Sequence, residues 1–453
     1  MSRCATLLLW LAVSLVAAVD AGKDPFLVKP YLQLGRNPRI GLALLWHTAD
    51  RDANFAVQTR TTGAWSASQP AVSRRISVSG IEPHRVWSVA LSAPKPGSRF
   101  AYRVQLDGAV VFEGETLQRP GRGTPHRFAV FGDCGQNTPA QRQIAYRVFQ
   151  TKPDFLFITG DIVYSRGRIS EYREKYFPIY GAAQASPETG APLLASTLFA
   201  ASPGNHDIAE KDFEKYPDTQ AYYYYWQQPL NGPLGEPGAF TSKTEGAAPF
   251  VDAFRKAAGA DYPRMANFSF DYGNAHWTVL DANPYTDWTK PELRDWLIAD
   301  LRAASRAQWR FVGFHHPGFN SSKAHFSEQR MRVLAPVFET LGVDIVFAGH
   351  VHNYQRTFPM LYDPFTSKWT LDRDYDGANR TKPKGVIYLV TGAGGAKLYN
   401  PEQQDDRASM QEFTHVFLSK INSFTLVETE RRKLTVRQID VDGKEIDRFM
   451  VTR

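Results

Sequence analysis

The sequence predicts an all-β sandwich followed by a layered α/β domain, in which mixed β-sheets are flanked by helices. Short apolar runs separated by turn residues fill the first quarter of the chain and are typical of a sandwich. From Arg127 onward, apolar runs alternate with helical segments, which is the pattern of a layered α/β domain. With 453 residues, 43% of them hydrophobic and 22% charged, the chain is long enough for both domains.

Residues 1–21 are typical of an export signal. Arg3 supplies the positive start, residues 7–13 lie in an apolar run, and residues 19–21 form a plausible small-residue cleavage site. Because the run is short for a membrane span, we expect a cleaved signal and a secreted or periplasmic protein without a membrane span. An uncleaved anchor is the alternative. Cleavage would remove Cys4 and leave Cys134 alone, which excludes an intramolecular disulfide.

Residues 22–118 form the predicted sandwich. Its strands are expected at residues 40–46, 86–91, 100–104 and 110–112, and a turn at residues 94–97 separates two of them. The Pro- and Gly-rich residues 120–125 predict a boundary, so the second domain covers residues 126–453.

The second domain is predicted to alternate strands and helices. Apolar runs predict strands at residues 128–131, 155–158, 276–280, 311–314, 344–348, 386–390, 424–427 and 434–436. Helices are expected at residues 139–149, 291–304 and 328–341, and Asp442-Gly443 predicts a hairpin turn. Residues 207–267 are irregular and contain the aromatic run 222–226. We expect this stretch to be either a surface excursion held by aromatic packing or a rim that shapes an active-site mouth.

The charge balance is mildly basic, with a formal net charge of +7 and a pI near 9.2. Without a Lys/Arg-rich run or a recognisable nucleic-acid module, this charge predicts a solvated surface rather than a nucleic-acid footprint. A basic field would still attract anionic substrates.

Five loops carry the predicted chemistry, and each follows an apolar run. They are Gly132-Asp133-Cys134-Gly135, Gly160-Asp161-Ile162-Val163-Tyr164, Gly204-Asn205-His206-Asp207, His315-His316-Pro317 and Gly349-His350-Val351-His352. Because the carboxyl ends of parallel strands lie along one edge of a sheet, these loops should share one centre. Their oxygen and imidazole donors predict a metal site. Since hard oxygen donors dominate the set, we expect Cys134 to be a small buried residue rather than a ligand.

This series of loops resembles the five-block pattern of the metallophosphoesterases, the calcineurin-like phosphoesterase superfamily. Tyr164, three residues after Asp161, makes the chain similar to the purple acid phosphatase branch. Residues 30–35 also resemble the start of that branch's β-sandwich, which is fibronectin-III-like. The resemblance covers nearly the whole mature chain.

The resemblance implies two metal ions bridged by Asp161. The first would be bound by Asp133, Asp161, Tyr164 and His352, and the second by Asp161, Asn205, His315 and His350. His206 and His325 match positions that meet the substrate, and His325 would be the proton donor. The alternative for His325 is an exposed histidine at a helix start. His316 would lie beside the metal ligands without binding a metal.

Physical reasoning agrees with this implied arrangement. A phenol normally titrates near ~10, so a Tyr164 phenolate needs a strongly charged ion beside it. That requirement favours a trivalent first ion, which in the family is Fe(III). The second donor set suits Zn, Mn or Fe(II).

We therefore expect an acid phosphatase, in which metal-bound hydroxide attacks the phosphorus of a phosphate monoester. A phosphodiesterase, or a nucleotide or pyrophosphate hydrolase, is an alternative on the same site. A non-catalytic protein that binds a surface through its β-sandwich is the alternative from another class. The expected partners are small-molecule or surface phosphate esters.

Overall fold

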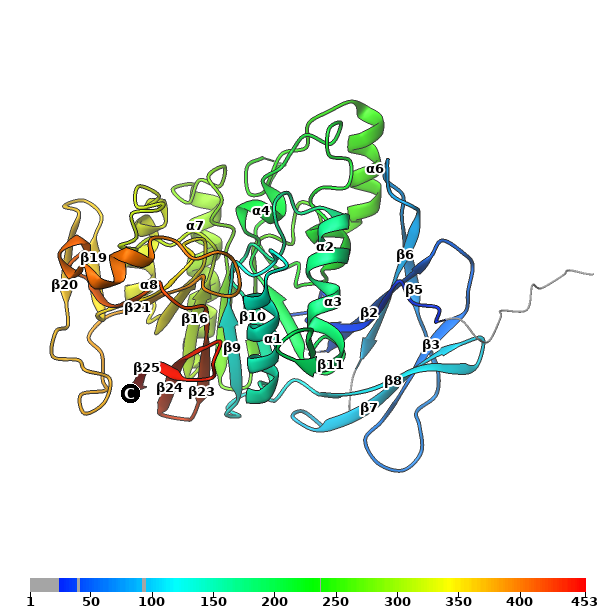
Figure 1. Ribbon diagram of the computed structural model, residues 1–453, viewed down its shortest axis with the longest axis horizontal. Helices are drawn as coiled ribbons and strands as arrows, with labels where there is room; N and C mark the ends of the chain where they lie inside the picture. The colour runs from blue at the N-terminus through cyan, green and yellow to red at the C-terminus, as the bar shows by residue number, and fades with distance from the viewer. Residues whose placement is uncertain (1–23, 39–40, 92–94, 237) are drawn as a thin grey trace, which may run out of the picture.

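Two large β-sheets organise the molecule, and they pack face to face in the α/β domain (Figure 1). The computed structural model describes residues 24–38, 41–91, 95–236 and 238–453. The ten-stranded sheet has the order β25 (Glu445–Thr452), β24 (Lys433–Asp440), β23 (Ser423–Thr429), β9 (Arg127–Phe131), β10 (Phe155–Ile158), β13 (Leu198–Ala201), β1 (Val28–Gln33), β2 (Leu42–Ala49), β6 (His84–Leu91) and β5 (Val72–Ile76). The seven-stranded sheet has the order β14 (Phe268–Tyr272), β15 (Ala275–Val279), β16 (Trp309–Gly313), β17 (Ile345–Ala348), β21 (Ile387–Thr391), β18 (Tyr354–Thr357) and β22 (Thr414–Leu418).

Helices cover the outer faces of both sheets and give four layers. Strand β9 shows the alternation: Phe128 faces the second sheet and contacts Phe311, whereas Ala129 packs in the cluster that contains Ile144 of α1. The helices are α1 (Pro139–Thr151), α2 (Ile169–Lys175), α3 (Phe177–Tyr180), α4 (Asn205–Ile208), α5 (Tyr222–Tyr225), α6 (Ala248–Ala258), α7 (Pro291–Ala303) and α8 (Ala335–Thr340). The predicted layered α/β fold is confirmed.

The predicted helices at residues 139–149 and 291–304 are confirmed as α1 and α7. Helix α1 begins where the Thr138 side chain accepts a hydrogen bond from the Gln141 amide, with Pro139 in its first turn. The helix predicted at residues 328–341 is wrong at its start. A 3-10 segment, Arg330–Leu334, comes first, and the α-helix begins only at Ala335, because Pro336 has no amide N–H to continue a helix from the preceding turn.

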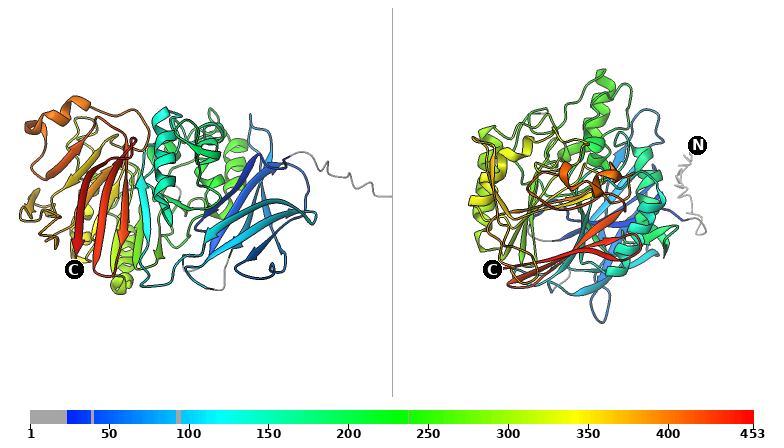
Figure 2. Two further views of the ribbon diagram at one scale, coloured as in Figure 1. Left: turned by 60° about the horizontal axis from the view of Figure 1, so that its bottom comes forward. Right: turned by 60° about the vertical axis from the view of Figure 1, so that its left-hand side comes forward.

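The β-sandwich shares one of its sheets with the α/β domain. Strands β1, β2, β6 and β5 belong to the ten-stranded sheet, where β1 pairs in parallel with β13 and brings Gln33 opposite Phe199. The second sheet of the sandwich contains β4 (Gln69–Pro70), β3 (Phe55–Arg60), β7 (Arg99–Leu106) and β8 (Ala109–Leu117). The sandwich (blue) therefore forms one end of a continuous structure (Figure 2). The predicted signal peptide lies outside the described residues.

The aromatic run 222–226 lies between the sandwich and the α/β domain. All five rings are buried, and the Tyr225 hydroxyl lies 2.9 Å from Nε2 of His84 on β6. Arg74 on β5 donates hydrogen bonds to the carbonyls of Tyr223 and Tyr224, at 3.2 and 2.7 Å. The expectation of aromatic packing is confirmed, but its location on a surface excursion is wrong, because the run is buried. That residues 207–267 shape an active-site mouth stays a prediction.

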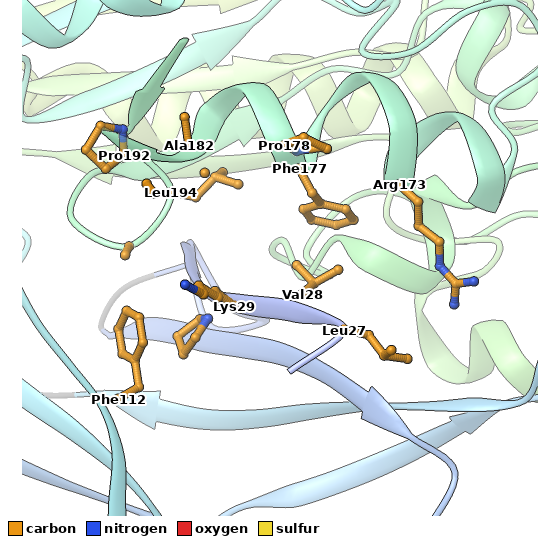
Figure 3. Close-up of a pocket in the computed structure, with 14 residues that line it drawn as sticks. Leu27, Val28, Lys29, Phe112, Arg173, Phe177, Pro178, Ala182, Pro192 and Leu194 are labelled. Atoms are coloured by element: carbon orange, nitrogen blue, oxygen red, sulfur yellow. The ribbon is translucent and has the colours of Figure 1, made fainter. Parts of the chain in front are cut away.

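A cavity of about 520 Å³ lies at the same junction (Figure 3). Val28 lines it from β1, Phe112 from β8 and Phe177 from α3, so both domains contribute to its walls. None of the residues predicted for the metal centre lines this cavity.

A buried histidine on β15, His276, connects α7 to the β14–β15 hairpin through contacts with two carboxylates. His276 Nδ1 lies 2.8 Å from Asp271 Oδ1, and its Nε2 lies 3.0 Å from Asp300 Oδ2 on α7. Burial lowers the pKa of His276, but the two carboxylates outweigh burial and raise it to about 9.

The remaining strands form two hairpins, β11 (Gly181–Ser186) with β12 (Gly190–Pro192) and β19 (Met360–Asp363) with β20 (Lys368–Leu371). Within the described part of the chain, none of the helices combines the length and the apolar character that a membrane crossing requires.

Candidate metal centre

The five donor loops meet where the carboxyl ends of the two sheets adjoin. Asp133 follows β9, Asp161 follows β10 and Asn205 follows β13, all in the ten-stranded sheet. His315 follows β16, and His350 follows β17, in the seven-stranded sheet. Strands β9, β10 and β13 are parallel to one another, as are β16 and β17, so each sheet brings its own donors to one edge.

One group of donors surrounds Tyr164. Its hydroxyl lies 3.2 Å from Asp133 Oδ1 and 3.0 Å from His352 Nε2. His352 Nε2 also lies 3.5 Å from Asp133 Oδ1. These three side chains are the ones that the family resemblance assigns to the first metal, together with Asp161.

A second group surrounds His315. Its Nε2 lies 3.1 Å from Asn205 Oδ1 and 3.3 Å from Asp161 Oδ1. The same nitrogen is 4.0 Å from Asp133 Oδ1, and ligand atoms of Asp133, Asp161 and His315 all lie within 4.8 Å of one another. The carboxylates therefore join the two groups into one cluster.

His350 lies beside this cluster. Its ring centroid is 5.0 Å from that of His315, and its backbone N–H donates to Asp133 Oδ2 at 2.8 Å. Its Nε2 points away, toward Glu328 Oε2 at 3.1 Å. With Nε2 on Glu328, Nδ1 is the ring nitrogen of His350 that remains for an ion in the cluster.

His315 and His352 are oriented in the same way, each by a backbone carbonyl. His315 Nδ1 donates to the Thr159 carbonyl and His352 Nδ1 donates to the Lys397 carbonyl, each at 2.7 Å, because a carbonyl oxygen can only accept. In each case the other ring nitrogen, Nε2, faces the carboxylates. Metal-binding histidines are typically oriented in this way by a second partner.

The cluster concentrates acceptors in a buried place. Asp133 is 0% and Asp161 is 1% exposed, and among the described residues neither has an ion pair with Lys or Arg. Burial would raise the pKa of Asp161, but His315 and His206 outweigh burial and lower it. Burial lowers the pKa of His315, yet Asp161 and Asp133 raise it to about 9. Converging lone pairs of this kind fit a bound cation.

The pKa shifts of Tyr164 and His350 also fit a bound cation. Burial, reinforced by the charges of Asp161 and Asp133, raises the pKa of Tyr164 well above its usual value, so only a strong positive charge would ionise it. Burial lowers the pKa of His350 and keeps its ring neutral, which is the form that binds metals.

His206 and His325 lie at the open side of the cluster. Their side chains are 35% and 32% exposed, whereas those of His315, His350 and His352 are at most 7% exposed. His206 Nδ1 donates to the Ser165 carbonyl at 2.7 Å, and its Nε2 lies 3.9 Å from Asp161 Oδ2.

His316 lies deeper in the structure. It is buried, and its ring centroid is 4.2 Å from that of His350.

Close backbone approach explains two of the loop glycines. A Cβ on Gly204 would lie 2.2 Å from Asp161 Oδ1, and a Cβ on Gly160, whose φ is +90°, would lie 2.6 Å from His315 Nδ1. Asp133, Asp161 and His350 themselves have φ of 56°, 51° and 67°, a region that non-glycine residues rarely adopt. Such strain is typical of functional sites.

Three nearby residues have no role in the prediction from the sequence. Tyr399 stacks on His352 with ring centroids 4.0 Å apart, and burial together with Asp133 and Asp161 raises its pKa to about 12. Asp207 accepts hydrogen bonds from the amides of Gly204 and Ile162. A lone Tyr or Asp carries no sequence signal of such a role.

Glu328 is the third of these residues. The hydrogen bond from His350, opposed by burial and supported by His325, lowers its pKa to about 2. Its spacing of three residues from His325 is a signal that could have indicated a contact.

Cys134 is buried, as expected. Its Sγ lies 3.7 Å from the Ile162 carbonyl oxygen, and burial raises the pKa of the thiol.

The chain is similar to several known proteins and solved structures. Purple acid phosphatase 21 of Arabidopsis thaliana is 26% identical over 320 residues, which are 69% of this chain and 58% of that protein. Purple acid phosphatase 23 of the same plant is 26% identical over 409 residues, 83% of this chain and 74% of that protein. A third relative, named probable inactive purple acid phosphatase 1, is 25% identical, and the match covers 82% of this chain and 58% of that protein.

Among solved structures, a purple acid phosphatase from seeds of yellow lupin (Lupinus luteus) matches with a TM-score of 0.66 and 17% identity, over 94% of this chain and 74% of that chain. PhoD matches with a TM-score of 0.59 and 14% identity, over 96% of this chain and 90% of that chain. These two likenesses concern the fold. Residues 126–354 match the family model described as calcineurin-like phosphoesterase, which covers half of the chain. The chain therefore belongs to the calcineurin-like phosphoesterase family.

Proposed function

We propose that this chain is a binuclear-metal hydrolase of phosphate monoesters, of the purple acid phosphatase type. The observation that carries the proposal is the buried cluster of Asp133, Asp161 and His315, whose ligand atoms converge and whose carboxylates have no Lys or Arg partner among the described residues. Such a cluster is costly unless cations fill it.

The contacts support two donor sets within the cluster. Asp133, Tyr164 and His352 lie within hydrogen-bonding or ion-pairing distance of one another. Asn205 and Asp161 each lie within such a distance of His315. The first set would hold one ion and the second set another, with Asp161 shared between them and His350 Nδ1 as the last donor of the second set.

The raised pKa of Tyr164 favours a trivalent ion, Fe(III), in the first set. The amide and imidazole donors of the second set suit Zn, Mn or Fe(II). When bound, such a pair supplies an activated water nucleophile and offsets charge on the phosphoryl oxygens.

The exposed histidines act on the substrate. His206 keeps Nδ1 on the Ser165 carbonyl, so its Nε2 is available to a phosphoryl oxygen. His325 keeps Nδ1 on Glu328 Oε1 at 2.8 Å, so its Nε2 is available to protonate the leaving alkoxide. The basic net charge of +7 favours anionic substrates over neutral ones. We also propose that the protein is exported, on the strength of residues 1–21.

The test measures metal content and activity on one preparation. Two metals per chain and hydrolysis of aryl and alkyl monoesters, with slower hydrolysis of diesters, are the expected results. Faster hydrolysis of diesters or of pyrophosphates would move the function to those substrates. A folded chain that binds two metals and hydrolyses none of these substrates would indicate a binding protein. A folded chain without metal would overturn the proposal.

A further inference from the structure

Glu328 contacts three histidines of the metal centre with one carboxylate. Its Oε1 lies 2.8 Å from Nδ1 of His325, and its Oε2 lies 3.1 Å from Nε2 of His350. Oε2 is also 3.9 Å from Nε2 of His316. We propose that Glu328 is a positioning residue. By accepting a hydrogen bond from each ring, it orients both the metal-binding nitrogen of His350 and the proton-donating nitrogen of His325. This inference rests on the proposed function.

An ionised carboxylate only accepts, so each ring nitrogen that faces Glu328 must carry a hydrogen. For His350 that nitrogen is Nε2, and the lone pair therefore resides on Nδ1. Glu328 does for His350 what the carbonyls of Thr159 and Lys397 do for His315 and His352.

The same reasoning applies to His325. Its Nδ1 donates to Glu328, which directs Nε2 to the opposite side of the ring, away from the carboxylate. The ring centroids of His325 and His350 are only 4.1 Å apart. A single orientation of the Glu328 carboxylate therefore places Oε1 on His325 and Oε2 on His350.

The turn that carries Glu328 is arranged for this contact. His325 has a φ of +57°, and its carbonyl accepts hydrogen bonds from the Glu328 amide at 3.1 Å and from Asn320 Nδ2 at 3.4 Å. Arg330 Nη1 lies 3.7 Å from Glu328 Oε2 and supplies a positive charge. A strained non-glycine residue persists only where its surroundings determine it, and here those surroundings include the carboxylate.

Glu328→Gln is the decisive variant, because the amide has the same size but donates from one end. One of the two histidines must then face a donor and lose its orientation. We expect metal affinity at the second site to fall about 10- to 100-fold, with the first site unchanged. At saturating metal, hydrolysis of an alkyl phosphate should fall more than that of a nitrophenyl phosphate, because only the alkyl leaving group depends on the His325 proton.

Glu339→Gln is the matched control. Glu339 is also half-buried and accepts a hydrogen bond from the Tyr362 amide at 2.7 Å, but it contacts no histidine of the site. It should leave metal affinity and the ratio of alkyl to nitrophenyl rates unchanged. In a His325→Ala background, Glu328→Gln should lower metal affinity without a further change in that ratio.

A measurement on the native metal-free chain tests the geometry without activity. The ¹⁵N chemical shifts of its imidazoles should report a hydrogen on Nε2 of His350, and Glu328→Gln should disturb this tautomer. Failure of the proposed function would appear in the native protein as absent metal or hydrolysis, while the tautomer would still be measurable.

Three results would overturn the inference. The first is a Glu328→Gln variant that behaves like the control, and the second is a loss of metal with an unchanged ratio of rates. The third is a native chain with three metals that becomes a chain with two, since this would make Glu328, with His316 and His350, a metal ligand itself.

Discussion

His276 should make the stability of the protein depend on alkaline pH. Its imidazole bridges Asp271 and Asp300, and its pKa in the folded state is raised to about 9 from an ordinary value of 6.5. A group that binds its proton more tightly when folded stabilises the fold most below its unfolded pKa. That contribution is lost as pH rises through about 9. The shift corresponds to about 3 kcal/mol.

The assay compares urea unfolding of the native chain and of His276→Gln, at pH 6 and at pH 10. We expect His276→Gln to be less stable by about 3 kcal/mol at pH 6, with most of the difference gone at pH 10. His415→Gln is the control. Burial lowers the pKa of His415 to about 4, so its ring is neutral throughout this range. A difference for His276→Gln that stays constant between the two pH values would refute the reasoning.

Four other predictions concern the metal centre. His325→Ala should slow alkyl esters about 100- to 10,000-fold more than nitrophenyl esters, with metal content unchanged; equal slowing of both would make His206 the better candidate for the acid. Asp161→Asn should lose more metal than any variant of a ligand to one ion, because it removes the anionic bridge, and retention of both metals would contradict that role. The native protein should be purple to pink and Tyr164→Phe colourless, by visible absorption alongside iron analysis; a colourless, iron-free, active native protein would exclude Fe(III). A fragment that begins near Arg127, if soluble, should bind two metals per chain, whereas a folded fragment without metal would contradict the ligand assignment.

Local sequence patterns predict most of the strands that carry the site. The apolar runs 128–131 and 155–158 are too short for helices, and each ends at a Gly-Asp pair, so strand and donor loop can be recognised together. Helices α1 and α7 are predictable because each has a proline in its first turn.

The remaining features depend on contacts between distant residues. Nothing local in Val28–Gln33 indicates that β1 will pair with β13, and a run of tyrosines has the same composition on a surface and in a core. The contact between Glu328 and His350 likewise joins two loops, and it exists only because β16 and β17 lie side by side. Donor types are therefore predictable from sequence, and the residues that orient them are not.

Strand β23, which lies late in the sequence, has a consequence for the newly made chain. Strand β9, which leads to Asp133, pairs with β10 on one side and with β23 on the other, where Val130 lies opposite Thr425. During synthesis that second edge stays unpaired until residues 423–429 have left the ribosome. An unpaired apolar edge is a template for aggregation, and pairing across such a sequence distance is slow. Chains cut short before residue 423 should therefore be recovered as aggregates rather than as folded fragments with a weakened site.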